Sequence, residues 1–184
     1  SFRGFRIAIP IREMLVLEDR MPSGRAYADY MNRLNRILGT MLGAEIDFIV
    51  KGIDSTTHSA VASRREAMLR KRQTFYLGKD VSGNPYIYPG RLVEARVIAV
   101  AEKVLRVEAF GIECAIFARD LSWQWVSDVR DLYSVGDRVL VRVQEISGED
   151  VEHLSIRADI RSTFSETSVD NLKKCQVQSK YAGK

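Results

Sequence analysis

The chain has 184 residues, of which 46% are hydrophobic and 28% are charged. This length suits one large domain or two small ones, and the apolar content excludes an intrinsically disordered tail. The formal net charge of +4 is a mild excess, which permits an anionic partner without requiring one.

The residue types also disfavour several classes of protein. The chain has two histidines and none of the GxxxxGKS, HExxH or GxSxG patterns, so enzyme chemistry is not expected. Cys114 and Cys175 are too far apart for a metal-binding or redox pair, as in proteins of a reducing compartment. No apolar run approaches the roughly 20 residues of a membrane span, and no signal peptide opens the sequence. We therefore expect a cytoplasmic protein with no catalytic residues, cofactor or metal site and no membrane contact.

Alternating and helical patterns follow one another in the first part of the chain. In chain order they predict a strand at 5–14, a loop at 21–24, a helix at 26–42 and a strand at 45–54. Gly43 lies where the helix is expected to stop. The apolar stripe of this helix is typical of core packing.

Residues 58–77 begin as a short strand and continue as a helix. Ser63 and Glu66 have the spacing of a capping box, which indicates that the helix begins there. The helix carries a run of cations, namely Arg64, Arg65, Arg70, Lys71 and Arg72. Such a run is either a solvated face or an anion-binding patch between two domains.

The stretch at 78–90 is rich in Gly, Pro, Asn and Asp, which indicates a boundary between two units. Short strands with alternating apolar residues follow, and a longer connection separates the third from the fourth. They are predicted at 92–101, 104–109, 112–118, 138–146 and 152–158. This order is typical of a small Greek-key barrel of the OB type.

Several stretches of this second unit carry a family pattern. They are glycine with alternating valines at 90–97, a strand that opens with glycine at 111–118, "DLSW" at 120–123, "VGDRVLVRV" at 135–143 and "LSIR" at 154–157. In this order they resemble the S-one domain, the RNA-binding OB repeat of the largest protein of the bacterial small ribosomal subunit. The resemblance implies a complete S-one-type OB domain at 78–162.

The first unit, at 1–77, is similar to part of the same repeat. Its stretches at 5–14, 43–54 and 60–68 are similar to strands three, four and five. The end of the chain at 163–184 resembles a linker and the first strand of a further repeat. The resemblance thus implies a mostly β fold with helices, in which tandem S-one-type five-stranded OB barrels, the first incomplete, are joined by a linker helix. We expect the chain to be a fragment of a longer array.

An OB barrel binds single strands on the outer face of strands two and three, where aromatic side chains stack on bases and cations meet phosphates. Alternation places Arg106 and Phe117 on this face. Trp123 is expected to pack beneath the barrel, whereas Trp125 is the better stacking candidate. The candidate RNA-binding residues are Arg106, Phe117, Trp125, Arg142 and Arg157, with Arg64, Arg65, Arg70, Lys71 and Arg72 as an auxiliary phosphate patch.

The resemblance implies a single-stranded RNA-binding module of a ribosomal S-one-like protein, which helps to place messenger RNA on the small subunit. The expected partners are single-stranded RNA and proteins of that subunit. A protein-docking module, which anchors a larger protein to the ribosome or another machine, is the alternative. Two departures from the family pattern support this alternative. The aromatic residue of strand two is replaced by Leu105 or Arg106, and the His of strand three is replaced by Phe117. Exposed apolar residues at 86–88 and on the helix at 26–42 would mark its docking surface.

Overall fold

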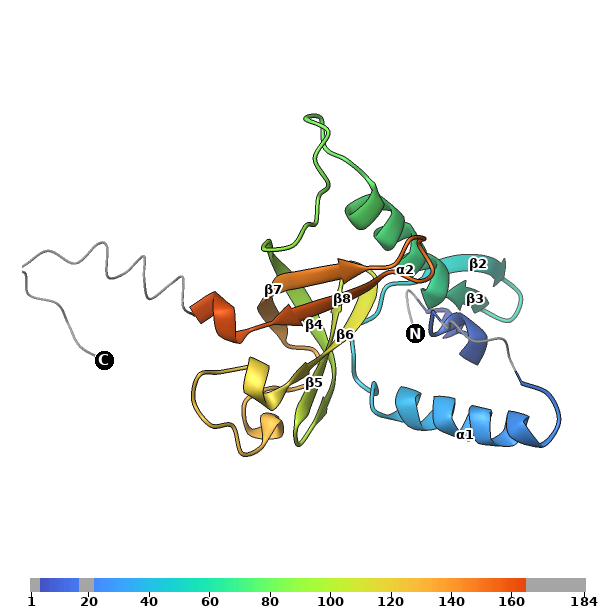
Figure 1. Cartoon of the computed structure of the whole chain (residues 1–184). Helices are drawn as coiled ribbons and strands as arrows, with labels where there is room; N and C mark the ends of the chain where they lie inside the picture. Colours follow the sequence, from blue (N-terminus) through green and yellow to red (C-terminus); the bar gives the residue numbers. More distant parts are fainter. Residues whose placement is uncertain (1–3, 17–21, 165–184) are drawn as a thin grey trace, which may run out of the picture.

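The computed structural model describes residues 4–16 and 22–164. A linker and the first strand of a further repeat are predicted at 163–184. From residue 165 on, this region lies outside the described residues, and so does Cys175. The strands are β1 (Arg6–Ala8), β2 (Ile49–Asp54), β3 (Ser59–Ser63), β4 (Leu92–Ala101), β5 (Val104–Ala109), β6 (Ile112–Phe117), β7 (Arg138–Ser147) and β8 (Ser155–Asp159), and the α-helices are α1 (Arg25–Gly39) and α2 (Arg64–Arg72). Figure 1 shows a barrel of β4 to β8 beside a smaller unit that contains the first three strands and both helices.

The barrel contains the predicted strands, with boundaries shifted by three residues at most. Its order is β6-β5-β4-β7-β8, and each hydrogen-bonded pair is antiparallel. The two end strands, β6 and β8, also lie against each other, so the twisted sheet curls into a nearly closed barrel (Figure 1). The mostly β fold and the five-stranded barrel of the OB type are therefore confirmed for this unit.

Alternation along the strands builds the core of the barrel. The fully buried inward residues include Val97, Leu105, Val107, Ile112, Ile116, Val141 and Val143. Their burial removes one face of every strand from water, which is the main term that stabilises such a barrel. The register of β4 shifts between Val97 and Ala99, and the intervening Ile98 is fully buried in a second core that belongs to the first unit.

The first unit is built on a sheet of order β1-β3-β2, in which β1 is parallel and β2 antiparallel to β3. The strand predicted at 5–14 is shorter than expected, because Pro10 cannot donate a backbone hydrogen bond and leads into a 3₁₀ turn at Ile11–Glu13. The strand predicted at 45–54 begins only at Ile49. Glu45 and Asp47, which precede it, form ion pairs with side chains of the barrel.

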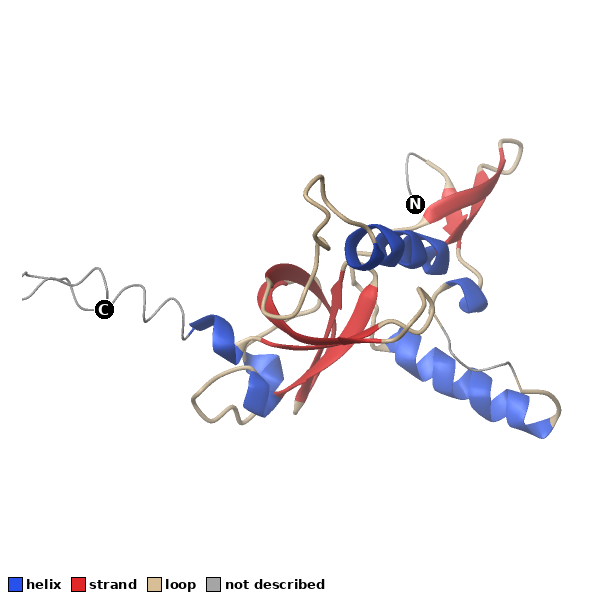
Figure 2. Ribbon diagram, turned by 45° about the horizontal axis from the view of Figure 1, so that its top comes forward, coloured by secondary structure: helices blue, strands red, loops and turns tan. Residues whose placement is uncertain are grey.

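Helix α2 begins, and helix α1 packs, as the sequence predicts. The Ser63 side chain accepts a hydrogen bond of 2.9 Å from the Glu66 backbone N–H, which confirms Ser63 as the N-cap of α2. The Glu66 carboxylate accepts from Lys51 and Arg70, so the second hydrogen bond of a capping box is replaced by these ion pairs. In α1, Leu34 is buried together with Met41, which follows the helix, against Leu15 and Ile98, so much of the apolar stripe is core. Figure 2 shows α1 projecting from the barrel. Among the described residues, no helix combines the length and apolarity needed to cross a membrane.

A close approach between α2 and the barrel fixes the position of the two units. Gly111 has a φ of +90°, and a Cβ atom at this position would lie 2.3 Å from the Met68 carbonyl oxygen of α2. Only glycine therefore permits both the turn from β5 to β6 and the contact with α2. The first unit consequently covers one end of the outer face of β4, β5 and β6 and leaves the other end exposed.

Candidate nucleic-acid interface

The outer face of β4, β5 and β6 has two chemically different ends. We call the end with Arg96, Glu108 and Glu113, over which α2 packs, the covered end. The other end, with Phe117 and the loop at 118–132, is called the open end. Arg106 lies between them, because it faces Ala115 in the register of β5 and β6.

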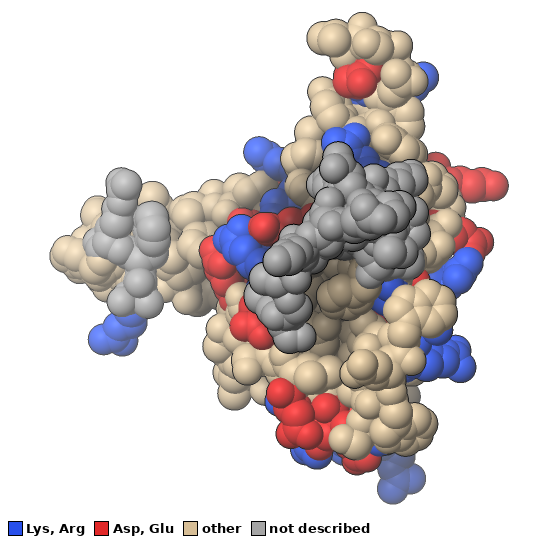
Figure 3. Space-filling model, turned by 90° about the vertical axis from the view of Figure 1, so that its left-hand side faces the viewer, with Lys and Arg blue, Asp and Glu red and all other residues tan. Residues whose placement is uncertain are grey.

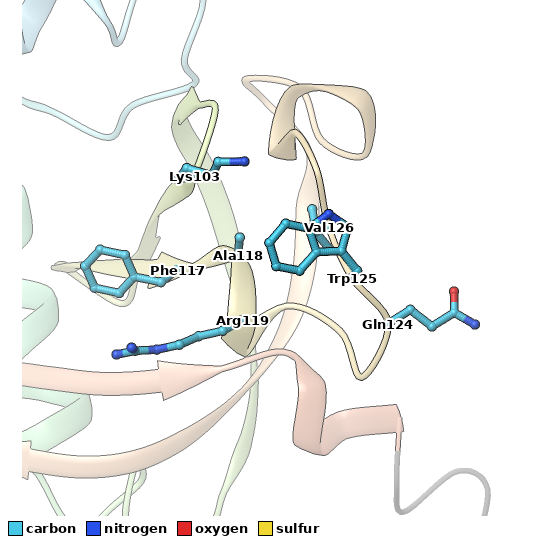
Figure 4. A pocket seen from close by; sticks show the side chains of 7 residues that line it. All are labelled: Lys103, Phe117, Ala118, Arg119, Gln124, Trp125 and Val126. Atoms are coloured by element: carbon cyan, nitrogen blue, oxygen red, sulfur yellow. The ribbon is translucent and has the colours of Figure 1, made fainter.

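A groove of about 370 Å³ opens at the open end (Figure 4). It is lined by Lys103, Phe117, Ala118, Arg119, Gln124, Trp125 and Val126. The end of β6 forms one wall, the loop between β6 and β7 forms the other, and the turn between β4 and β5 contributes the lysine (Figure 4). Small pockets of this kind, apolar with a few polar groups, are typical ligand sites.

The aromatic rings of the groove are exposed and each has a cation beside it. Phe117 is 52% exposed and Trp125 is 88% exposed. The Arg119 guanidinium lies 5.7 Å from the Phe117 ring centroid, and the Lys103 ammonium lies 5.9 Å from the Trp125 ring. Exposed rings with neighbouring cations are suited to stacking on bases while the cations meet phosphates.

Trp123 lies exposed, so the prediction that it packs beneath the barrel is wrong. Its ring is 68% exposed, and the Arg161 guanidinium lies 4.6 Å from the ring centroid. The packing of this loop comes instead from Leu121, Val126 and Val129, which are buried in the barrel core. Trp123 therefore adds a further aromatic surface to the open end.

The cations at the open end have only weak ionic partners. Arg119 lies 3.6 Å from Asp120, and Lys103 lies 3.3 Å from Glu102, with all four side chains at least partly exposed. Exposed pairs of this kind contribute little. Lys103 also donates a hydrogen bond to the Ser127 carbonyl, an exposed contact that leaves the other donors of its ammonium group to a phosphate. The hydrogen bonds from Arg130 lower the pKa of Asp128 to about 2, so this neighbouring carboxyl stays ionised at neutral pH. Arg130 is paired with it.

The covered end, by contrast, is a network of ion pairs. Glu108 lies 2.9 Å from Arg96, 3.6 Å from Arg64 and 3.7 Å from Lys71. Burial raises the pKa of Asp47, but the hydrogen bonds from Lys71 and Arg96 outweigh burial and leave this pKa below its usual value. The charges of this end are thus used to join the first unit to the barrel.

Arg106 faces outward as predicted, but it is not free. Its guanidinium forms an ion pair with Glu113, and the same carboxylate accepts a hydrogen bond of 2.8 Å from Arg64. Its side chain keeps partial access to solvent between the two ends.

For Arg64 and Arg72, the prediction of a phosphate patch is wrong, because both side chains are buried beneath the barrel. Arg64 also donates to the Met14 carbonyl at 2.8 Å, and Arg72 donates to the Gly111 carbonyl at 2.7 Å. Buried arginines need such partners, since an unpaired charge away from water is costly. These residues hold the two units together and do not face an external anion.

The exposed cations of α2 also have acidic partners. Arg65 pairs with Glu152 at 2.8 Å, Arg70 pairs with Glu66 at 2.8 Å, and Lys71 pairs with Asp47. The basic run seen in the sequence is therefore largely neutralised in the fold. On the part of the surface that described residues form in Figure 3, basic and acidic side chains are likewise interspersed.

Arg142 and Arg157 do not line the groove. Arg142 donates to the Gly90 carbonyl at 2.7 Å, and Arg157 pairs with Glu145 at 3.3 Å. The structure therefore brings Phe117 and Trp125 together and leaves the other candidates outside their groove. Sequence reasoning missed Lys103 and Arg119, although the hairpin turn and the end of the third strand meet at the same rim of an OB barrel.

Within the described residues, no group of three or more His, Cys, Asp or Glu side chains is arranged to hold a metal ion. The one cysteine in this part of the chain, Cys114, is buried, and burial raises the pKa of its thiol to about 12. Such a thiol stays protonated and inert at neutral pH.

Comparison with known proteins finds a family similarity for the barrel region. Residues 87–156 match the family model described as S1 RNA binding domain, the S-one domain of the sequence resemblance. This match covers most of the barrel and none of the first unit. No curated protein sequence matches the chain.

Two solved structures are similar in part. A chain of the a/eIF2alpha-aDim2p-rRNA complex from Pyrococcus horikoshii OT3 has 20% identity and a TM-score of 0.38, over 48% of this chain and 53% of that one. GSP13 from Bacillus subtilis has 18% identity and a TM-score of 0.36, over 52% of this chain and 65% of its own. The chain thus spans between half and two thirds of the length of these proteins, and TM-scores this low transfer no feature of them to it.

Proposed function

We propose that the chain binds single-stranded RNA, with bases stacked on the aromatic rings of the open end and phosphates held by the adjacent cations. The observation that carries this proposal is the groove between Phe117 and Trp125, each exposed and each beside a cation. The match of residues 87–156 to an RNA-binding domain supports the same class of ligand.

The groove predicts weak binding without a strict sequence preference. Each stacked base contributes about 1–3 kcal/mol, and every base offers a flat face to an aromatic ring. Two stacked bases with two phosphate contacts give modest, salt-sensitive affinity, because each phosphate contact releases counterions. A single module of this strength gains in affinity when it is linked to others.

We further propose that the chain belongs to a ribosomal S-one-like protein in the cytoplasm, where it helps to place messenger RNA on the small subunit beside proteins of that subunit. The sheet of the first unit supports a tandem arrangement. β2 and β3 pair antiparallel as β7 and β8 do, and β1 lies beside β3 as β6 lies beside β8. This is the strand arrangement that a partial copy of the last three strands of the barrel would have.

Protein docking is the rival function, and the loop at 78–91 is its best surface. Tyr86 and Tyr88 are exposed there, whereas Ile87, part of the predicted docking patch, is buried. Val81 in the same loop and Tyr27 of α1 are exposed as well, so apolar residues remain at the surface in both parts of the predicted docking surface.

Fluorescence anisotropy of a labelled single-stranded RNA of about 12 nucleotides, within the site sizes of OB folds, tests the proposal. The double variant Phe117→Ala, Trp125→Ala removes the groove, and the double variant Tyr86→Ala, Tyr88→Ala is the matched control. We expect salt-sensitive binding by the unmodified chain, a loss of about tenfold or more in the groove variant and no loss in the control. No binding at low salt would overturn the proposal in favour of docking.

A further inference from the structure

One carboxylate on the outer face of β6 is shared by two arginines from different parts of the chain. Oε1 of Glu113 accepts a hydrogen bond of 2.8 Å from Nη1 of Arg64, which lies at the start of α2. Oε2 of the same residue accepts from Nη2 of Arg106 on β5. The first unit thus supplies positive charge to an acidic group of the barrel.

Arg64 is built into the interface and cannot leave it at low cost. Its side chain is 0% exposed, and it also donates to the Met14 carbonyl at 2.8 Å. Its Nη2 lies 3.6 Å from Glu108, and neither Nε nor Nη2 has a hydrogen-bond partner among the described residues. A buried guanidinium with unsatisfied donors holds nearby carboxylates tightly, because losing them leaves an uncompensated charge.

The position of Arg106 connects this cluster to the groove. Arg106 faces Ala115 in the register, and Ala115 and Phe117 lie on the same face of β6, about 7 Å apart along the strand. A strand of RNA with a base on Phe117 therefore passes Arg106 when it continues along the barrel towards the covered end. Without Arg64, the charges of Arg106 and Glu113 would cancel on this path.

We propose that Arg64 is a positioning residue for RNA binding. Arg64 pairs with Glu113 and offsets the charge of this carboxylate, so a net positive charge remains at the Arg106 guanidinium. Arg106 then binds the phosphate next to the base that lies in the groove. This inference rests on the proposed function and deepens it, because α2 acts on RNA by neutralising a carboxylate and without touching the ligand.

A double-mutant cycle separates this role from a purely structural one. RNA affinity is measured for the unmodified chain, Arg64→Gln, Glu113→Gln and the double variant, with the folded fraction of each checked by circular dichroism. We expect Arg64→Gln to weaken RNA binding on the order of fivefold, because Glu113 then neutralises Arg106 alone. Glu113→Gln and the double variant should bind at least as tightly as the unmodified chain, although both are less stable.

A matched control is Glu152→Gln, which breaks the ion pair between Arg65 of α2 and the turn between β7 and β8. RNA affinity should not change in this variant. If the double variant keeps the loss seen for Arg64→Gln, Arg64 acts only through the fold and the inference fails. If RNA binds and the groove variant loses it while Arg64→Gln does not, the inference fails but the proposed function stands. If the unmodified chain binds no RNA, the proposed function fails first.

Discussion

The covered and open ends of the outer barrel face differ in what their charges do. At the covered end, Glu108 and Glu113 are each bound by more than one cation, and the network lies beneath the first unit. At the open end, Lys103 and Arg119 have weak partners and lie beside exposed aromatic rings. The end with more charge is therefore the less available to a ligand.

This difference shows that a basic run in a sequence can indicate ion pairs within the protein as readily as a binding site for an external anion. The cations of α2 meet acids that come from β5, β6 and the turn between β7 and β8, far away in the sequence. A helix that fastens two units and a helix that binds phosphate have similar compositions. Only the positions of the acids distinguish them.

The strongest test of the covered end is removal of its buried cation. Arg64→Ala leaves Glu113 paired with Arg106 alone and removes one of the cations around Glu108. Breaking a buried pair in this way costs about 3–5 kcal/mol. We expect a loss of this size in the free energy of unfolding, measured with urea. Arg70→Ala is the control, since Arg70 is 69% exposed and its pair with Glu66 follows the i,i+4 spacing of a helix. A small loss for Arg64→Ala would contradict the assignment of this end as structural.

A smaller effect is expected where the backbones of the two units touch. Gly111→Ala places a methyl group against the Met68 carbonyl in a left-handed backbone conformation. Strain of this kind costs about 1–3 kcal/mol, and the clash with α2 adds to it. Gly136→Ala is the matched control, because Gly136 has a φ of +97° and open space around it. Equal losses of unfolding free energy in the two variants would show that α2 does not press on Gly111.

The smallest expected effect is the response of the covered end to pH. Because the pKa of Asp47 is lower in the folded chain than its usual value of 3.8, its ion pairs contribute stability above that value. That contribution is lost as the pH falls through the folded-state pKa. The urea midpoint should therefore drop as the pH falls from about 5 to below 3.8, and Asp47→Asn should weaken this dependence. An unchanged dependence in the variant would assign the drop to other carboxyls.

Most of the barrel could be predicted from the sequence, because apolar residues alternate along most of each strand and the turns carry Gly and Asp. The residues at 135–143 gave both the turn and β7. Ile98 could not be predicted, since a register shift turns it away from the alternation and into the core of the first unit. The strand predicted at 5–14 is longer than β1, because Pro10 ends the strand pairing at Ala8.

The site was only partly predictable. Alternation correctly placed Phe117 outward. Trp125 lies exposed in the same groove, but Trp123 is exposed too, so the choice of Trp125 for stacking stays a prediction. The pairing of Arg106 with Glu113 is a cross-strand contact that two neighbouring strands permit but do not require. The burial of Arg64 depends on how the two units pack, and no local pattern records that.

The most direct test of which end binds RNA is the amide and indole NMR spectrum of the chain during addition of a short single-stranded RNA. The chain has two tryptophans, so their indole N–H signals are readily assigned with one Trp125→Phe variant. We predict that RNA shifts the Trp125 indole signal and the amides of Phe117 and Arg119, while the amides of α2 at 64–72 stay in place. Shifts concentrated in α2 with unmoved indole signals would contradict the account.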